Sequence, residues 1–516
     1  MQIPSSPLQT GHSYISDILL LFYFWQDDGC VRFSHELSEG EKEATGNRKA
    51  KVMDCLKSLG IACAEDNMPN IAVLGSGGGL RAMIALQGTL VELKNQGLLD
   101  AVMYLCGVSG STWCMSFLYQ EKDWTENVQA LEECLRDTLS NSPCDIKEEF
   151  AVATQAAEEE LFSLTDDWAS FFVYPALKQY DMTKLSEHKD ATTNGTNPYP
   201  IYAAIEANPW QKVEEGTWFE FTPHESGFPG LGAFVCTEDL GSKFKNGDLK
   251  EKRDEKNICY LQGLWGSALG SMEEIINYLI GNDCTSAHCQ GLLLLLLELH
   301  IHASAGKNCE GIFTQLKEVL KGCVWHVWKL LWKTVTCICS WTWGWTNNFL
   351  YTDSEDQSTG LTNKEFIHLI DAGLAINSAY PLVLRPERKV KLILSFDFSS
   401  GDPFETIKKT AEYCKVNNIP FPKINPEEIK DIDNLSDCYI FRGIDVPTVM
   451  HFPLFNNNNC SDEIKDFRVT FTTFTSSYSE DNVKVLLKKA KMNVSNNKER
   501  ILKEIQQILS SSTKEF

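Results

Sequence analysis

Residues 71–111 read IAVLGSGGGLRAMIALQGTLVELKNQGLLDAVMYLCGVSGS, and two strand–turn–helix units follow one another within them. In the first unit the apolar run 71–74 predicts a buried strand. The glycine-rich segment 75–79 comes directly after it and predicts a tight turn. Residues 80–95 then have the spacing of a helix that ends near a glycine.

The second unit repeats this order. The apolar run 102–106 predicts another buried strand, and the turn 107–111 leads into a further helix. Two such units in succession are typical of neighbouring parallel strands. We therefore expect an α/β fold built on a sheet with a parallel centre.

The overall composition narrows the function classes. Hydrophobic residues make up 43% of the chain, enough for a large core. The net charge of −23, from 70 acidic and 47 basic residues, argues against a nucleic-acid partner, which requires a basic surface. The 18 cysteines are scattered, and neither a secretory signal nor a run of about twenty apolar residues is found. We expect a reduced, cytoplasmic location and no membrane-spanning helix.

The rest of the chain divides by composition. Residues 1–35 are predicted to be an N-terminal tail, and residues 36–516 one catalytic domain. Ser38 and Glu41 form a capping-box pattern at the start of a helix over about 38–60. Residues 271–350, rich in leucine and tryptophan, are predicted to be a helical and aromatic insertion, a lid or cap.

The turn Gly107-Val-Ser-Gly-Ser111 has the pattern of a nucleophile elbow. Small residues flank Ser109 because the strand-to-helix turn is tight, and the next helix directs free N–H groups at developing negative charge. Ser111 stands where the commonest form of this motif has glycine. From this turn alone, a nucleophile and an ordinary Ser-Gly turn both remain possible.

The glycines at 77–79 fit the same chemistry, because consecutive glycines allow backbone N–H groups to approach an oxyanion. Arg81 follows at the helix start and can either meet a lipid phosphate or steady the loop. A dinucleotide loop is disfavoured, since Leu80 replaces its third small residue. A P-loop is disfavoured because no Gly-Lys-Ser/Thr follows.

The base is less clear from the residues alone. His224, His368 and His451 are the histidines of interest, but none has the context of a triad member. Asp371, expected to end an apolar helix over 366–370, is an alternative, because a buried carboxylate can have a raised pKa and take a proton directly from serine. The residues alone leave it one candidate among 70 acids.

Over about residues 40–510 the sequence resembles the cytosolic (group IV) phospholipase A2 family, most closely its gamma branch. The blocks that carry the resemblance are Gly75-Ser-Gly-Gly-Gly-Leu-Arg-Ala82, Gly107-Val-Ser-Gly-Ser-Thr-Trp113, Pro198-Tyr-Pro-Ile201, Trp218-Phe-Glu-Phe-Thr-Pro-His224, Gly241-Ser-Lys-Phe244, Leu264-Trp-Gly-Ser-Ala268, Asp371-Ala-Gly-Leu-Ala-Ile-Asn377 and Phe396-Asp-Phe-Ser399.

The resemblance implies a patatin-like three-layer α/β/α catalytic domain with a Ser–Asp dyad. Carried over by position, the roles are nucleophile for Ser109, base for Asp371, oxyanion hole for Gly78 and Gly79, and binding of the substrate phosphate for Arg81 and Arg388. The implied activity is that of a phospholipase A2 and lysophospholipase, with a lysophospholipid as substrate or as acceptor of the acyl group. The implied location is peripheral, on the phospholipid surface of intracellular membranes.

Two departures from the family pattern shape further expectations. No lipid-binding C2 domain fits before the glycine loop, so calcium, and any other metal or cofactor, is expected to be unnecessary. The C-terminal prenylation signal of some gamma members is missing, so a constitutive lipid anchor is not expected. A catalytically silent lipid-binding or scaffold protein is the alternative reading, because intact motifs do not prove a competent site.

Three segments remain open at this stage. The Trp-rich segment 324–332 fits an interfacial helix, a lid, or a buried insertion. The leucine run 292–297 favours a buried helix. A third group has zinc-ligand side chains but fits no standard zinc site: Cys284, His288, Cys289, His300 and His302.

Overall fold

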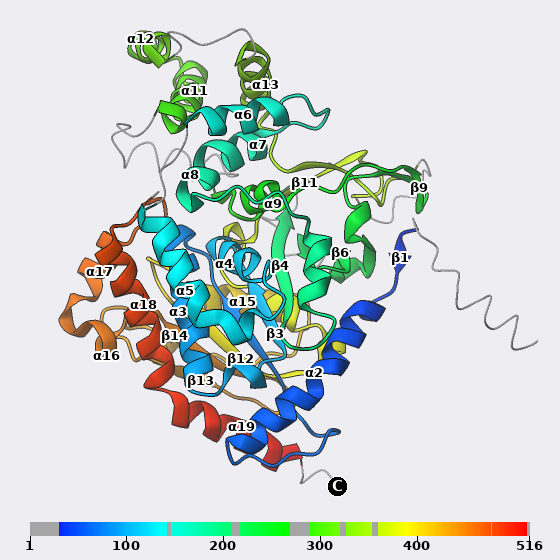
Figure 1. Ribbon diagram of the computed structural model, residues 1–516, viewed down its shortest axis with the longest axis vertical. Helices are drawn as coiled ribbons and strands as arrows, with labels where there is room; N and C mark the ends of the chain where they lie inside the picture. The colour runs from blue at the N-terminus through cyan, green and yellow to red at the C-terminus, as the bar shows by residue number, and fades with distance from the viewer. Residues whose placement is uncertain are drawn as a thin grey trace, which may run out of the picture.

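A computed structural model of the protein describes residues 30–141, 146–207, 217–268, 288–319, 327–352, 360–475 and 477–512. Its centre is a mixed sheet of twelve strands, with helices packed against it (Figure 1). Ten strands follow one path across the sheet, in the order β1-β7-β6-β5-β4-β3-β2-β12-β14-β13. The expected α/β class is therefore confirmed.

The middle of the sheet is parallel. Its strands are β4 (Tyr199–Glu206), β3 (Tyr104–Gly107), β2 (Asn70–Gly75), β12 (Val390–Asp397) and β14 (Thr448–Pro453). The two strands predicted at 71–74 and 102–106 are β2 and β3, adjacent and parallel. The carboxyl ends of all five strands lie at one edge of the sheet, where turns can bring side chains together.

Antiparallel strands extend the sheet on both sides. On the β4 side these are β5 (Trp218–Phe221), β6 (Glu225–Phe228), β7 (Ala233–Cys236) and β1 (Arg32–Phe33), and β13 (Tyr439–Phe441) closes the other side. β1 lies within the range predicted to be a tail, so the sheet begins earlier in the chain than expected. A separate hairpin consists of β8 (Lys243–Lys245) and β9 (Asp248–Glu251).

One predicted helix is wrong. Residues 366–370 belong to strand β11 (Phe366–Asp371), which pairs antiparallel with β10 (Trp345–Asn347) and with β4. A short apolar run fits a buried strand as well as a buried helix. Here the run forms a strand because β10 and β4 supply its backbone hydrogen-bond partners. Asp371 thus ends a strand of the central sheet.

Helices pack over the sheet (Figure 1). α2 (Glu39–Ser58) starts at the predicted cap, where Ser38 Oγ accepts the Glu41 N–H at 3.0 Å. α3 (Gly79–Asn95) packs against α4 (Gly110–Leu118) and α18 (Glu480–Ser495). The other helices of this part are α5 (Trp124–Asn141), α8 (Tyr174–Leu177), α9 (Ile258–Trp265), α14 (Tyr380–Val383), α15 (Glu405–Val416), α16 (Asn457–Cys460), α17 (Ile464–Thr470), α18 (Glu480–Ser495) and α19 (Lys498–Ser512).

A group of five helices, which we call the cap lobe, lies beyond the carboxyl ends of the parallel strands (Figure 1). It comprises α6 (Ile146–Ala156), α7 (Leu164–Trp168), α11 (His288–Ser304), α12 (Glu310–Val319) and α13 (Val327–Ser340). Three of these helices come from the predicted insertion 271–350. Whether they act as a lid stays a prediction.

The cap lobe has a small core of its own. Leu295 of α11, Ile312 and Leu316 of α12, and Leu331 of α13 form one buried cluster. The leucine run, predicted to be a buried helix, lies in α11, and Leu293 is buried as well. That prediction is confirmed for Leu293, Leu295 and Leu297, whereas Leu296 is only partly buried.

Three kinds of feature are absent from the described residues. None of their helices is both long and apolar enough to span a bilayer. No disulfide joins the cysteines among them, and no group of their His, Cys, Asp and Glu side chains is arranged to hold a metal ion. Cys284 and the side chains of His288 and Cys289, from the zinc-like group, lie outside the described residues.

Candidate active site

Ser109 sits at the turn between β3 and α4, in the conformation that the elbow motif requires. Its backbone has φ 52° and ψ −123°, a region that L residues rarely occupy. Such strain persists only where the surroundings hold it, and it is common at functional sites. The Ser111 hydroxyl helps to fix the turn in this conformation, since it donates a hydrogen bond to the Ser76 carbonyl at 2.6 Å. The serine that departs from the commonest motif therefore ties the elbow to the glycine loop.

The glycine loop lies directly against this elbow. A Cβ atom added at Gly110 would overlap the carbonyl oxygen of Gly79, so only glycine allows the two turns to touch. Gly78 and Gly79 have φ values of 149° and 60°, which favour glycine. Within the described part of the chain, neither of their backbone N–H groups has a hydrogen-bond partner. Both N–H groups are therefore available beside Ser109.

Asn377 braces this loop, a role that sequence reasoning missed. Its backbone carbonyl accepts the Gly77 N–H at 3.0 Å, and its side-chain amide donates to the Gly77 carbonyl at 3.2 Å. The same amide donates to Ser399 Oγ at 2.8 Å. The sequence held one clue to this role: Asn377 is the polar residue at the end of the block that begins at Asp371.

Arg81 braces the loop from the other side. Its guanidinium is buried and donates to the carbonyls of Phe398 and Phe471, at 2.6 and 2.5 Å. A Cβ atom at Gly78 would lie 2.5 Å from Arg81 Nη2, so the two residues are in contact. Burial lowers the pKa of Arg81 to about 10, which leaves it charged at neutral pH. These contacts fit loop support, one of its two predicted roles, better than contact with a substrate phosphate.

Strand register brings Asp371 to Ser109. On one edge of β4, β3 pairs as far as Tyr202, which faces Gly107. β11 pairs with β4 from Ala204 onwards, and Ala204 faces Asp371. β5 occupies the opposite edge of β4, so β3 and β11 meet end to end on the shared edge. The Ser109 hydroxyl is then close enough to the Asp371 carboxylate to lower its pKa by hydrogen bonding.

The surroundings of Asp371 suit a base. Burial raises the pKa of its carboxyl group to about 7, and the hydrogen bonds from Gly373 and Ser109 oppose that rise. The Gly373 N–H donates to Asp371 Oδ1 at 2.8 Å. The Asp371 N–H donates to Ser267 Oγ at 3.1 Å, so Ser267, to which the sequence assigned no role, fixes the end of β11. A carboxylate poised near neutral pH can exchange protons with a hydroxyl.

The three histidines of interest serve the fold. His224 Nδ1 bonds the Tyr199 hydroxyl at 2.8 Å, and burial lowers the pKa of His224 to about 4. His368 bonds the Trp343 carbonyl, and His451 bonds the Pro403 carbonyl. None of the three is hydrogen-bonded to Ser109 or Asp371, in keeping with the structural role expected for them.

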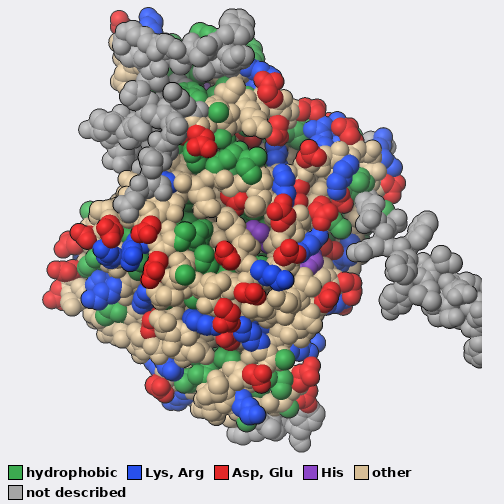
Figure 2. Space-filling view, viewed as in Figure 1, with side chains coloured by type: hydrophobic (Ala, Val, Ile, Leu, Met, Phe, Trp, Pro, Cys, Tyr) green, Lys and Arg blue, Asp and Glu red, His purple; other side chains and the backbone are tan. Residues whose placement is uncertain are grey.

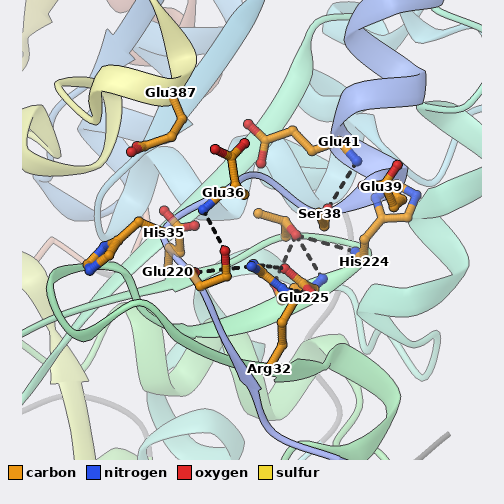
Figure 3. A network of polar contacts seen from close by, with 12 residues as sticks. Arg32, His35, Glu36, Ser38, Glu39, Glu41, Glu220, His224, Glu225 and Glu387 are labelled. Carbon is orange, nitrogen blue, oxygen red and sulfur yellow. Dashed lines mark hydrogen bonds and ion pairs between the residues drawn. The ribbon is translucent and has the colours of Figure 1, made fainter. Parts of the chain in front are cut away.

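Arg388 does not lie at this site, which corrects the phosphate-binding role implied for it. Arg388 precedes the amino end of β12, whereas Ser109 follows the carboxyl end of β3. Because these strands are parallel, the two residues lie at opposite ends of the strands. Its side chain is 0% exposed and forms ion pairs with Glu41 at 2.9 Å and Glu220 at 2.8 Å. Figure 3 shows these two acids together with their neighbours. The carboxylates hold the pKa of Arg388 well above its usual value, so it is a permanent buried charge.

Replacement of Arg388 by alanine is expected to destabilise the fold rather than weaken lipid binding. It leaves the buried Glu41 carboxylate without its ion-pair partner and Glu220 with Arg385 alone, a change that costs about 3–5 kcal/mol. Thermal unfolding should show the midpoint lowered strongly. Lys408→Ala, which removes a half-exposed pair with Asp402, is the control and should shift it little. A stable Arg388→Ala protein with only a raised KM would restore the phosphate-binding role.

Comparisons with known proteins agree with this geometry. A family model described as a lysophospholipase catalytic domain matches residues 71–283. The mouse protein cytosolic phospholipase A2 gamma is 36% identical over 92% of this chain and 91% of its own length. Its human counterpart is 40% identical over 92% of this chain and 95% of its own length. The chain belongs to the cytosolic phospholipase A2 family. It is accordingly a phospholipid-hydrolysing esterase.

Solved structures give the same fold. The human GIVD cytosolic phospholipase A2 superimposes with a TM-score of 0.73 at 26% identity, over 94% of this chain and 69% of that one. A second structure of that relative, in complex with methyl gamma-linolenyl fluorophosphonate, has a TM-score of 0.68 and covers 66% of its chain. The predicted patatin-like α/β/α catalytic fold is confirmed.

Proposed function

We propose that this cytosolic phospholipase A2 family member is a calcium-independent phospholipase A2 and lysophospholipase that works through a Ser109–Asp371 dyad. One observation carries the proposal: Ser109, with its strained backbone, places its hydroxyl next to a buried carboxylate whose pKa it lowers, and beside two glycine N–H groups that have no partner among the described residues. Nucleophile, base and oxyanion donors are the three groups that acyl transfer requires.

The reaction proceeds in two steps. Ser109 Oγ attacks the ester carbonyl carbon while its proton passes to Asp371, and the N–H groups of Gly78 and Gly79 stabilise the oxyanion. The carbon–oxygen bond to the lipid alcohol then breaks, and Asp371 returns the proton to that leaving oxygen. Water attacks the acyl-Ser109 ester in the same way and releases the fatty acid. A second lysophospholipid can replace water, and the acyl group is then transferred to it.

A solved relative supports the nucleophile. Human GIVD cytosolic phospholipase A2 forms a complex with a fluorophosphonate bearing a linolenyl chain. Fluorophosphonates carry a tetrahedral phosphorus that activated serines attack, so an alkyl fluorophosphonate is a direct probe of Ser109 in this chain.

The cellular location that we propose is set by the phospholipid substrate, which lies in membranes. We propose that the enzyme acts from the cytoplasm, peripherally on the phospholipid surface of intracellular membranes. Its relatives are named cytosolic, and the described cysteines form no disulfide, as expected in a reducing compartment.

Product analysis tests the activity. The substrate is a phosphatidylcholine with different acyl chains at its two glycerol positions, supplied as vesicles with and without excess lysophosphatidylcholine. We expect release of the chain at the second position, hydrolysis of the lysophospholipid, and new diacyl lipid when lysophospholipid is in excess. A calcium chelator should leave these rates unchanged, because every role in the mechanism is filled by a protein group. Loss of hydrolysis on chelation, with recovery on added calcium, would refute calcium independence.

The rate should depend on pH through Asp371. The carboxylate must be ionised to accept the serine proton, and its pKa is about 7. We expect kcat/KM to rise by about tenfold per pH unit below that pKa and to level off above it. A pH–rate profile checks this, with circular dichroism at each pH as the control for folding. An inflection near pH 4, the ordinary value for aspartate, would remove Asp371 as the base.

A further inference from the structure

Helix α13 of the cap lobe carries large apolar side chains on its outer face. Trp328 is 57% exposed, Trp332 is 75% exposed and Val335 is 40% exposed. Their spacing of four and then three residues places them on one stripe of the helix. We call these three residues the α13 stripe. Water contact with two indole rings on one helix face is unfavourable, and such patches mark surfaces that bind a partner.

The opposite face of α13 is firmly attached. Leu330, Cys337 and Ile338 are buried, and the Thr334 hydroxyl donates to Asp167 Oδ1 of α7 at 2.9 Å. The helix thus has two apolar faces, one covered by the cap lobe and one exposed. The exposed stripe is a feature of a packed helix rather than of a loose segment.

The two lysines beside the stripe are both held by contacts within the protein. Lys329 forms an ion pair with Glu158, and Lys333 donates to the Glu159 carbonyl and lies 5.6 Å from the centre of the Phe162 ring. The charge of Lys329 is thus compensated by Glu158, whereas Lys333 keeps its charge with its ammonium group held by the Glu159 carbonyl. With a net charge of −23 on the whole chain, attraction to anionic lipid is weaker still.

The stripe lies at the same end of the molecule as the dyad. α13 packs on α7, α7 packs on α9, and Ser267 just after α9 holds the backbone of Asp371. In Figure 1 the cap lobe lies beyond the strand ends that carry the site. Figure 2 shows hydrophobic side chains on the visible face of this lobe, next to acidic ones.

We propose that the α13 stripe docks the enzyme on the interface of a zwitterionic phospholipid bilayer. Trp328 and Trp332 sit at the boundary of headgroups and acyl chains, where indole rings are favoured, and Val335 lies among the upper acyl carbons. Docking is driven by apolar burial and not by charge. The inference rests on the proposed function only in that the bilayer is the source of the substrate.

Vesicle sedimentation tests the stripe without any turnover. The full-length Ser109→Ala protein is mixed with phosphatidylcholine vesicles, and the bound fraction is compared with that of the same protein carrying Trp328→Ala and Trp332→Ala. We expect the partition coefficient to fall by about tenfold or more, because two large aromatic surfaces are lost. Ile444→Ala with Val469→Ala, exposed apolar residues outside the cap lobe, is the matched control and should bind like the parent.

Two further measurements distinguish apolar docking from misfolding and from electrostatic binding. Val335→Glu, which puts a charge on the stripe, should weaken binding as the double variant does, with an unchanged thermal unfolding midpoint. High salt should change binding little, since an electrostatic contact would be screened. Parent-like binding by the double variant, or binding that high salt abolishes, overturns the proposal. The parent's failure to bind vesicles at all would point to a protein partner for the stripe and would also overturn it. Because the readout is binding by a Ser109→Ala protein, these outcomes are independent of the dyad.

Discussion

The Ser109→Ala protein is expected to lose phospholipid hydrolysis by a factor on the order of 10⁶, the loss seen when a serine hydrolase is deprived of its nucleophile. The remaining groups, the glycine N–H donors and Asp371, cannot form an acyl-enzyme without Ser109 Oγ. Release of labelled fatty acid from vesicles measures the loss. A fluorophosphonate carrying a fluorophore should label the parent protein and leave the variant unlabelled.

Ser116→Ala is the matched control for this substitution. Ser116 lies on the same helix, α4, is also buried, and donates its hydroxyl to the Trp113 carbonyl at 3.1 Å. Its loss should leave labelling intact. Two results would contradict the assignment: near-normal turnover by Ser109→Ala, or labelling that persists in it. Absence of labelling in the folded parent would favour the catalytically silent lipid-binding or scaffold protein.

Asp371→Asn should damage catalysis less than Ser109→Ala does and, at the same time, stabilise the fold. Asparagine keeps the size of the side chain but cannot take the serine proton, so kcat should fall by roughly 10²–10⁴-fold. The Gly373 N–H can still donate to the asparagine side-chain oxygen, as it does to Asp371 Oδ1. The site should therefore stay folded while the base is lost.

The stabilisation follows from the raised pKa. Unfolded, Asp371 has a pKa near 3.8, and folded it has a pKa of about 7. Between these values the folded state binds more protons than the unfolded state, so this group makes the protein less stable as pH rises, by about 1.4 kcal/mol per pH unit. At pH 8 Asp371→Asn removes a buried charge, and its free energy of unfolding should exceed that of the parent. At pH 4 the two should be nearly equal.

Denaturant unfolding at both pH values measures this difference. Asp181→Asn is the control, since Asp181 is a buried acid outside the dyad that accepts the Thr183 N–H at 2.9 Å. It should lose stability at pH 8 and retain activity. An Asp371→Asn protein that keeps its turnover, or that is less stable than the parent at pH 8 alone, would contradict the role of Asp371 as a desolvated base.

The sequence predicted the parts of the site that are local in the chain. Apolar runs followed by glycine-rich turns identify β2 and β3 with the loops at Gly78 and Ser109, because the strand, turn and helix signals all lie within about ten residues of one another. The same holds for the strained backbone at Ser109, since the small neighbours that permit it adjoin it in the chain.

The parts set by distant pairing could not be predicted from residues alone. The run 366–370 suits a helix or a strand until its partner β4 is known. The ion-pair partners of Arg388 could not be predicted from its neighbours in the chain, because Glu41 is 347 residues away and Glu220 is 168 residues away. Only the resemblance to the family singled out Asp371, and the same resemblance misplaced Arg388.

The end-to-end meeting of β3 and β11 along β4 bears on how such an enzyme can diversify. The 261 residues between Ser109 and Asp371 include all five helices of the cap lobe, yet the spacing of the dyad depends on the register of three strands. Segments in this interval can lengthen, shorten or change composition during evolution without moving the reacting groups. A slip of one residue between β11 and β4, by contrast, would turn the carboxylate to the other face of the sheet. We therefore expect variation to be tolerated in the cap lobe, which we propose meets the lipid, and not in the few backbone hydrogen bonds that join β11 to β4.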